Sequence, residues 1–279
     1  MAAISDGDVR TIRPSRGFTG FGLAELWRHR ELVLVLARRN VTVRYKQTQL
    51  GVLWAVLQPL FTMVVFTFVF HRVAKISSQG IPYPIFAYAA LLPWALFATS
   101  LAQSSVSIVG ASSIIGKVYF PRMAIPVATV LAALVDFAVA SVVLVGMMVY
   151  FGVFPSPEAA LVLPLFMLLA VTTALGAGLW FSALNVRYRD VQYTVPFLIQ
   201  IGLFITPVAY PATLVNEPLR TILAINPMTG VVEGFRWALL DVDTPPGLLL
   251  LVSCAVSLTM LVSGALFFRR MERTFADVI

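Results

Sequence analysis

The segment GASSIIGKV, from Gly110 to Val118, resembles the phosphate-binding loop of nucleotide-binding proteins. Such a loop places four residues between its first glycine and the Gly-Lys pair, and a Ser or Thr hydroxyl then binds magnesium. Here five residues separate Gly110 from Gly116, and Val118 replaces the hydroxyl-bearing residue. We therefore expect this chain to have no nucleotide site and no cofactor of its own.

Other catalytic or metal sites have little support in the sequence. His29 and His71 are far apart, no Cys/His cluster has metal-ligand spacing, and the single cysteine, Cys254, excludes an intramolecular disulfide. The GxSxG motif of serine hydrolases is absent. Asp241 and Asp243 could suggest a glycosyltransferase, but they fall in a predicted external segment, where solvated loop charges are the better interpretation. The sequence thus predicts no metal site and no enzymatic activity.

Two aromatic stripes on long apolar segments suggest a different chemistry. A seven-residue step is almost two helical turns, so aromatic residues at steps of seven or four share one face of a helix. Such faces can stack on the apolar C–H surfaces of sugar rings, and glutamines lie in the same segments. The candidates for a glycan path are Trp54, Gln58, Phe61, Phe68, Tyr193, Phe197, Gln200 and Phe204. The alternative is that the rings only pack helices or contact lipid.

Charged residues near the apolar segments add two further candidates. Arg44, Tyr45 and Lys46 precede the first long apolar run, where cationic side chains can hold the anionic headgroup of a lipid. Anchoring the topology alone is the alternative. Asp136 lies inside an apolar run, where burial of a charge is expensive enough to indicate a role. Because one carboxylate makes a poor proton relay, Asp136 is predicted to make a helix–helix hydrogen bond or to act in a conformational change.

Membrane-spanning helices must position these candidates. Hydrophobic residues make up 59% of the 279 residues and charged residues 12%, against about 25% charged residues in soluble domains. A helix needs about 20 apolar residues to cross the hydrocarbon, and its backbone groups must be paired there. Six runs qualify: Leu50–Phe70, Ile85–Gly110, Met123–Phe154, Ala159–Leu184, Val191–Val215 and Gly247–Phe268. They lack the alternation of barrel strands, so the predicted fold is all-α, with six transmembrane helices within residues 49–270.

The distribution of basic residues orients these spans. Sixteen of the 20 Lys and Arg residues fall in the segments that six spans place on one side, together with both termini. The other four, Arg236 among them, fall in the predicted external segments. Cytoplasmic segments carry the excess of positive charge, so both termini are predicted to be cytoplasmic. The net charge of +7 therefore follows the topology, and we expect no nucleic-acid partner.

Several segments are predicted to depart from a plain bundle. Residues 23–48 carry apolar residues at helical intervals between arginines, which predicts an amphipathic helix in the cytoplasmic interface; a partly ordered, solvated arm is the alternative. Prolines between Pro207 and Pro227 interrupt an apolar stretch, which predicts short re-entrant or interfacial helices on the outer side rather than an ordinary loop. No cleavable signal peptide is apparent; residues 1–22 are predicted to be a disordered tail and residues 271–279 a cytoplasmic tail.

The inner loop from Gly116 to Pro126 is too apolar for a free loop and too short for a domain. An apolar patch with a charged rim is typical of a docking surface. The residues predicted to contact a partner protein are Lys117, Val118, Tyr119, Phe120 and Arg122.

Four blocks of sequence together resemble the permease subunits of type-2 ABC exporters for O-antigen, capsule and teichoic acid polymers. The blocks are ARRNVTVRYKQTQLGVLWAVLQPL (37–60), GKVYFPRMAIP (116–126), NVRYRDVQYTVPFLIQIGLFITPVAYP (185–211) and NPMTGVVEGFRWALL (226–240). The resemblance implies a homodimer of six-helix subunits beside two copies of a separate ATPase subunit, which would hold ATP and magnesium. It also implies that the N-terminal helix and the inner loop contact the ATPase, and that the external broken helices line the exit.

The expected function is therefore export of lipid-linked polysaccharide, such as the O-antigen of lipopolysaccharide, across the bacterial cytoplasmic (inner) membrane. The resemblance implies an undecaprenyl-pyrophosphate carrier or a similar lipid, or a phospholipid anchor. The first alternative is a type-2 ABC permease for a drug or another small hydrophobic molecule. A membrane-bound transferase and an ion-coupled transporter are further alternatives, although an ion-coupled transporter usually has inverted repeats and several intramembrane charges, whereas this sequence shows no convincing inverted repeat and only Asp136 well inside a span.

Overall fold

The structure is a computed structural model that describes residues 23–46, 51–117, 119–241 and 247–275. Within these ranges the secondary structure is helical and no strand occurs, which confirms the predicted all-α class. The predicted tail 1–22, Val118 and the last four residues of the predicted tail 271–279 lie outside the described residues.

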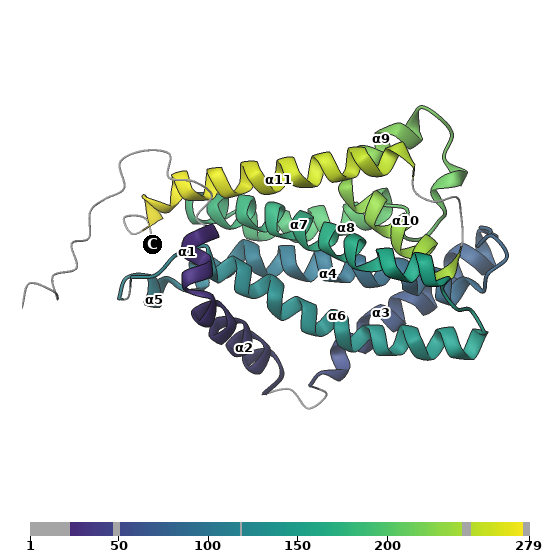
Figure 1. Cartoon of the computed structure of the whole chain (residues 1–279), viewed down its shortest axis with the longest axis horizontal. Coiled ribbons are helices and arrows are strands. Elements are labelled where there is room, and N and C mark those ends of the chain that lie inside the picture. Colours follow the sequence, from purple (N-terminus) through teal and green to yellow (C-terminus); the bar gives the residue numbers. More distant parts are fainter. Residues whose placement is uncertain (1–22, 47–50, 118, 242–246, 276–279) are drawn as a thin grey trace, which may run out of the picture.

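Among the residues that the structure describes, five helices are long and apolar enough to cross a membrane. They run side by side along the long axis of the molecule (Figure 1). These helices are α3 (Leu53–Phe66) continued by a π-helical segment (Thr67–Val73), α4 (Tyr83–Gly110), α6 (Ala124–Phe151), α7 (Pro157–Arg187) and α11 (Leu248–Glu272). Each lies on one of the predicted apolar runs, so the chain is a multi-pass integral membrane protein.

The remaining predicted run, Val191–Val215, forms a shorter helix than expected. Helix α8 (Val191–Ile205) has 15 residues and ends where Thr206 adopts an extended conformation before Pro207. Fifteen residues rise about 22 Å, whereas the hydrocarbon core of a bilayer is about 30 Å thick. The proline cannot donate a helical hydrogen bond, so the apolar sequence beyond it does not extend the helix. The sixth span therefore stays a prediction.

Short helices follow α8 in the region that the prolines divide. A 3-10 turn (Ala212–Leu214) precedes α9 (Leu219–Ile225) and α10 (Pro227–Leu240), and the Asn226 side chain caps α10 by accepting a hydrogen bond from the Met228 amide. These helices lie at the end of the bundle opposite the C-terminus (Figure 1). Helix α10 is largely buried against α4, α7 and α11. Two short helices were predicted here; their depth in a membrane stays a prediction.

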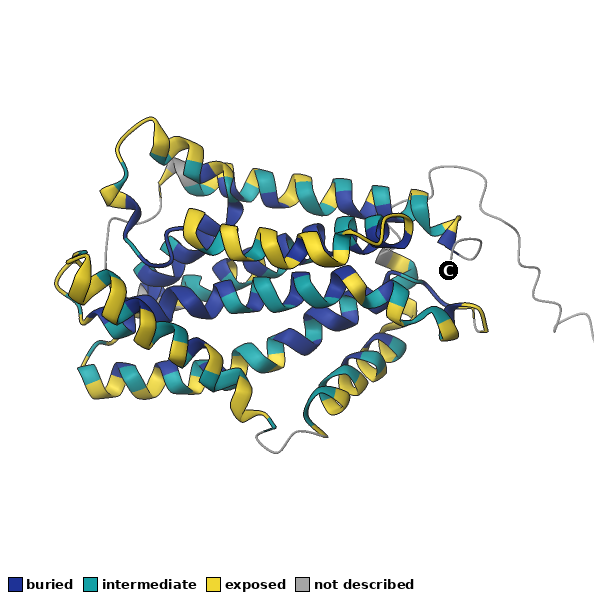
Figure 2. Cartoon of the chain, turned by 180° about the vertical axis from the view of Figure 1, so that it is seen from behind, coloured by how far each residue is buried: buried dark blue, intermediate teal, exposed yellow. Residues whose placement is uncertain are grey.

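Helix α4 forms the centre of the bundle. Every residue from Ile85 to Trp94 is buried, so all faces of this helix segment are covered by protein. Its neighbours are α3, α6, α7, α8 and α10. Figure 2 shows the buried residues concentrated along the middle of the bundle, whereas the surrounding helices carry exposed residues on their outer faces. Helix α4 is therefore the central helix of the core, and the other helices pack around it.

The predicted N-terminal helix is present as α1 (Leu23–Arg28) and α2 (Arg30–Lys46), which are separated by a turn at His29. Helix α2 buries Val33 and Ala37, packs on α6, and runs obliquely to the bundle (Figure 1). An ion pair of 3.4 Å between Glu25 and Arg269 ties α1 to α11. The N-terminal helices are thus attached to the bundle, and their location in the membrane interface stays a prediction.

Candidate functional site

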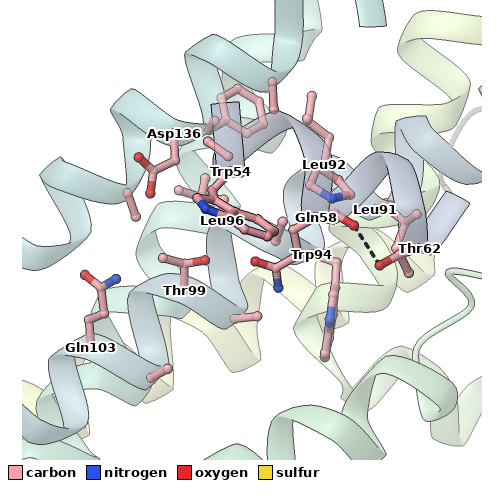
Figure 3. Close-up of a pocket in the computed structure, with 18 of the residues that line it drawn as sticks. Trp54, Gln58, Thr62, Leu91, Leu92, Trp94, Leu96, Thr99, Gln103 and Asp136 are labelled. Atoms are coloured by element: carbon pink, nitrogen blue, oxygen red, sulfur yellow. Dashed lines mark hydrogen bonds between the residues drawn. The ribbon is translucent and has the colours of Figure 1, made fainter. Parts of the chain in front are cut away.

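A cavity of about 540 Å³ lies between α3, α4, α6 and α8 (Figure 3), and Arg44 and Tyr45 of the last turn of α2 also line it. Its walls combine the indole rings of Trp54 and Trp94 with aliphatic side chains of α4. Polar side chains interrupt these walls, among them Gln58 of α3 and Gln200 of α8. The cavity therefore offers apolar surfaces with a few hydrogen-bonding groups, which is the usual composition of a ligand site.

A charged cluster forms the end of the cavity where α2 meets α6. The Arg44 guanidinium forms an ion pair with the Asp136 carboxylate, and its second terminal nitrogen donates a hydrogen bond to the Gln103 side-chain oxygen. The Tyr45 hydroxyl donates a hydrogen bond to the other oxygen of Asp136. Figure 3 shows Asp136 and Gln103 on the same side of the cavity. This cluster joins α2, α4 and α6.

Burial and hydrogen bonding set the protonation of the tyrosine in this cluster. Burial, together with the hydrogen bond to Asp136, raises the pKa of Tyr45 to about 12. The phenol therefore stays protonated at neutral pH and remains a hydrogen-bond donor. The cluster thus presents two donors, one of them cationic, to a single carboxylate.

The structure brings together two candidates that the sequence treated separately. Arg44 and Tyr45 were predicted to hold a lipid headgroup, whereas Asp136 was predicted to make a helix–helix hydrogen bond or to act in a conformational change. Lys46, the third residue of the predicted headgroup site, is exposed. Gln103 was missed altogether, since an uncharged residue within a long apolar run gives no signal of its own. The roles of these residues stay predictions.

The two aromatic stripes divide between the cavity and the outer surface. Trp54, Gln58 and Gln200 line the cavity. The other five residues do not line it, and their exposed fractions lie between 54% and 74%: Phe61, Phe68, Tyr193, Phe197 and Phe204. These five rings therefore do not pack the core of a single chain. They face whatever surrounds α3, its π-helical continuation and α8, either lipid or another subunit.

The predicted docking loop is partly held by its own chain. Tyr119 is 81% exposed and Lys117 is exposed, but Phe120 is buried among core residues at the end of the bundle. The Arg122 amide donates to the Glu272 carboxylate over 3.1 Å, and the Arg122 guanidinium donates to the Glu272 carbonyl. Phe120 and Arg122 therefore fix the loop against α11. Lys117 and Tyr119 remain accessible to a partner.

Arg236 was not among the predicted site residues; it was only counted in a predicted external segment. It lies on α10 with only 1% of its surface exposed. Its guanidinium lies 3.6 Å from the centre of the Phe86 ring, a cation–π geometry. Four backbone carbonyls accept hydrogen bonds of 2.5–3.3 Å from it: those of Phe86, Pro207, Val208 and Tyr210.

These contacts of Arg236 satisfy the backbone where the chain leaves α8. Carbonyls at a helix end have no helical partner, and Pro207 and Pro211 offer no amide hydrogen. An arginine in an apolar block close to such a break is the signal that could have identified the contact.

Metal binding has no support in the part of the chain that the structure describes. No group of three or more His, Cys, Asp and Glu residues there is arranged to hold a metal ion.

Comparison with known proteins places this architecture in a family. A family model described as ABC-2 type transporter matches residues 31–240, a range that includes every residue lining the cavity. An O-antigen export system permease protein RfbA of Myxococcus xanthus is 30% identical over 258 residues, which cover 91% of this chain and 98% of the relative. RfbA of Klebsiella pneumoniae is 28% identical over 249 residues, 89% of this chain and 95% of that protein. The polysialic acid transport protein KpsM of Escherichia coli is 26% identical over 248 residues, 86% and 93% of the two chains. This chain belongs to the ABC-2 type transporter family.

Proposed function

We propose that this chain is the membrane-spanning permease subunit of an ATP-driven exporter that moves lipid-linked polysaccharide from the cytoplasmic side of the membrane outward. The observation that carries the proposal is the similarity to O-antigen and polysialic acid transport proteins over at least 93% of their own lengths. Relatives matched over nearly their whole length share the transmembrane region rather than one module. The drug-permease alternative has no comparable support among these relatives.

The cavity supports a role in receiving one end of such a substrate. A volume of 540 Å³ lies in the range of ligand sites, about 300–1,000 Å³, and is far too small for a polymer. It can hold a headgroup or the first sugars, with Trp54, Trp94 and the glutamines as stacking and hydrogen-bonding surfaces. Arg44 at its end, with Lys46 exposed nearby in the chain, supplies the positive charge that a phosphate-linked lipid requires, and the Tyr45 hydroxyl adds a hydrogen-bond donor.

The exposed aromatic stripes support a path for the polymer outside the cavity. A polysaccharide must slide, so its contacts should be numerous, weak and tolerant of register. Stacked rings meet that need, and five of the stripe rings are exposed on α3, its π-helical continuation and α8. We assign these faces to a path between two copies of the chain in a homodimer, because a second copy would cover the path and exclude lipid from it.

The proposed exporter contains a separate ATPase, present in two copies, which binds ATP and magnesium. The accessible Lys117 and Tyr119 of the inner loop, and the exposed side of α2, are the surfaces assigned to this partner. The subunit itself catalyses no reaction. It resides in the bacterial inner membrane with both termini in the cytoplasm, as the excess of basic residues on one side predicts.

Co-purification and ATP hydrolysis test this function together. The tagged chain should bring down an ATPase, and hydrolysis by the reconstituted complex should rise when a lipid-linked glycan is added. A hydrophobic drug added at the same concentration as the glycan serves as the comparison. Stimulation by the drug but not by the glycan would favour the other class of permease.

A further inference from the structure

The groups assigned to an anionic headgroup already hold an anion that belongs to the chain itself. Arg44 and Tyr45 both direct their donors at the two oxygens of Asp136, one donor to each oxygen. Gln103 accepts from the remaining terminal nitrogen of Arg44. The contact is also the place where the end of α2 is fastened to the middle of α6. Occupancy of the site and the position of α2 are therefore linked.

We propose that the Asp136 carboxylate is an internal competitor for the headgroup site, and that an incoming phosphate or pyrophosphate group exchanges with it. The exchange breaks the contacts of Asp136 with Arg44 and Tyr45, so it releases the end of α2 from α6. This inference rests on the headgroup site in the proposed function and adds its regulation. The cluster acts as a latch that stays closed until the lipid-linked substrate arrives.

Charge and accessibility both favour such an exchange. Pyrophosphate carries more negative charge than one carboxylate, and the attraction of Arg44 grows in proportion to that charge. The side chains of Arg44 and Asp136 are 22% and 17% exposed, so the ion pair borders open space instead of being sealed in the core. Both residues line the cavity.

The fate of the released carboxylate decides whether the latch can open. A charge left in hydrocarbon would be prohibitively costly. Asp136 instead faces the cavity, together with the Gln103 carboxamide, whose amide hydrogens can donate hydrogen bonds. The released carboxylate therefore keeps polar surroundings.

A permanent structural clamp is the competing explanation, and it makes the opposite prediction for binding. If Asp136 only positions Arg44, its loss leaves the guanidinium less well placed and weakens anion binding. If Asp136 competes for the site, its loss strengthens anion binding. Arg44 itself is required for binding in either case.

The test measures binding of farnesyl pyrophosphate to the full-length chain in lipid nanodiscs, with farnesol as the uncharged probe and farnesyl phosphate as the probe with one phosphate. Asp136→Asn should tighten binding of farnesyl pyrophosphate by roughly tenfold, which corresponds to about 1.4 kcal/mol, and leave farnesol unchanged. Arg44→Gln should abolish the preference for farnesyl pyrophosphate over farnesol, alone or with Asp136→Asn. Asp190→Asn and Arg39→Gln are matched controls, since both residues are exposed and neither lines the cavity.

Unchanged or weaker pyrophosphate binding by the Asp136→Asn variant would overturn the latch. In that case, an Arg44→Gln variant that no longer prefers farnesyl pyrophosphate over farnesol would still support the headgroup site. An Arg44→Gln variant that keeps this preference would contradict the headgroup site as well.

Hydrogen exchange on the unmodified chain gives a second readout that does not depend on a variant folding. Farnesyl pyrophosphate should accelerate amide exchange in the last two turns of α2, from Arg39 to Lys46, and farnesol should not. Slower or unchanged exchange would contradict the release of α2, since a ligand that merely binds protects the segment that it contacts.

Discussion

Arg236 should contribute strongly to the stability of the fold, because it binds the backbone of the segment that follows α8. Hydrogen bonds to charged groups contribute about 1.5–3 kcal/mol each. The two shortest from Arg236, to the carbonyls of Pro207 and Val208, are 2.6 and 2.5 Å long. Counting only these two, Arg236→Met should lower the free energy of unfolding by about 3–6 kcal/mol. At roughly 2 °C per kcal/mol or more, the Tm should fall by at least about 6 °C.

The assay is thermal unfolding of the purified chain in detergent, in which size-exclusion chromatography measures the folded fraction that remains after heating. Arg236→Lys should give an intermediate Tm, because lysine keeps the charge but cannot reach several carbonyls with one planar group. Arg72→Met is the control, because Arg72 is an exposed arginine. An Arg236→Met variant with a Tm within about 2 °C of the wild-type value would refute the reasoning. Leaving buried carbonyls without hydrogen-bond donors should cost more free energy of unfolding than so small a shift indicates.

Two further outcomes follow from burial and a third from the predicted topology. Phe61→Ala should leave protein level and Tm nearly unchanged while export falls, because the exposed ring contributes little to the core; export that tracks protein level would return Phe61 to a packing role. Tyr119→Ala should weaken co-purification of the ATPase at unchanged Tm, whereas Phe120→Ala should cost about 3–5 kcal/mol of stability; equal binding by Tyr119→Ala and wild type would contradict the docking assignment. In a Cys254→Ser background, a cysteine at Asn216 should react with an impermeant reagent from outside; labelling only from the cytoplasmic face would reverse the topology.

The transmembrane helices could be predicted because lipid leaves the sequence few choices. Long apolar runs must pair their backbone groups internally, so Ile85–Gly110 and Met123–Phe154 became α4 and α6 with small shifts at their ends. The end of α8 was harder to predict, because the apolar run continues to Val215. Pro207 ends the helix, and the mean hydropathy of a long window is hardly changed by a single proline.

The partners of the site residues could not be predicted, because they depend on packing between distant segments. Arg44 and Asp136 are 92 residues apart and meet only because α2 lies along α6. Periodicity assigned the aromatic residues to common helical faces, but it could not tell which rings border a cavity and which face outward. Arg236 shows the same limit, since it was predicted only to lie in an external segment, and the carbonyls that it contacts belong to another segment.

The polysaccharide on the cell surface is the most direct measure of whether this chain exports lipid-linked polysaccharide. In the source organism, deletion of the chain should abolish the surface polymer while the lipid-linked polymer accumulates on the cytoplasmic side of the inner membrane. Expression of the wild-type chain should restore the surface polymer, and the Arg44→Gln variant should not. A deletion strain with normal surface polysaccharide and no internal accumulation would contradict the account.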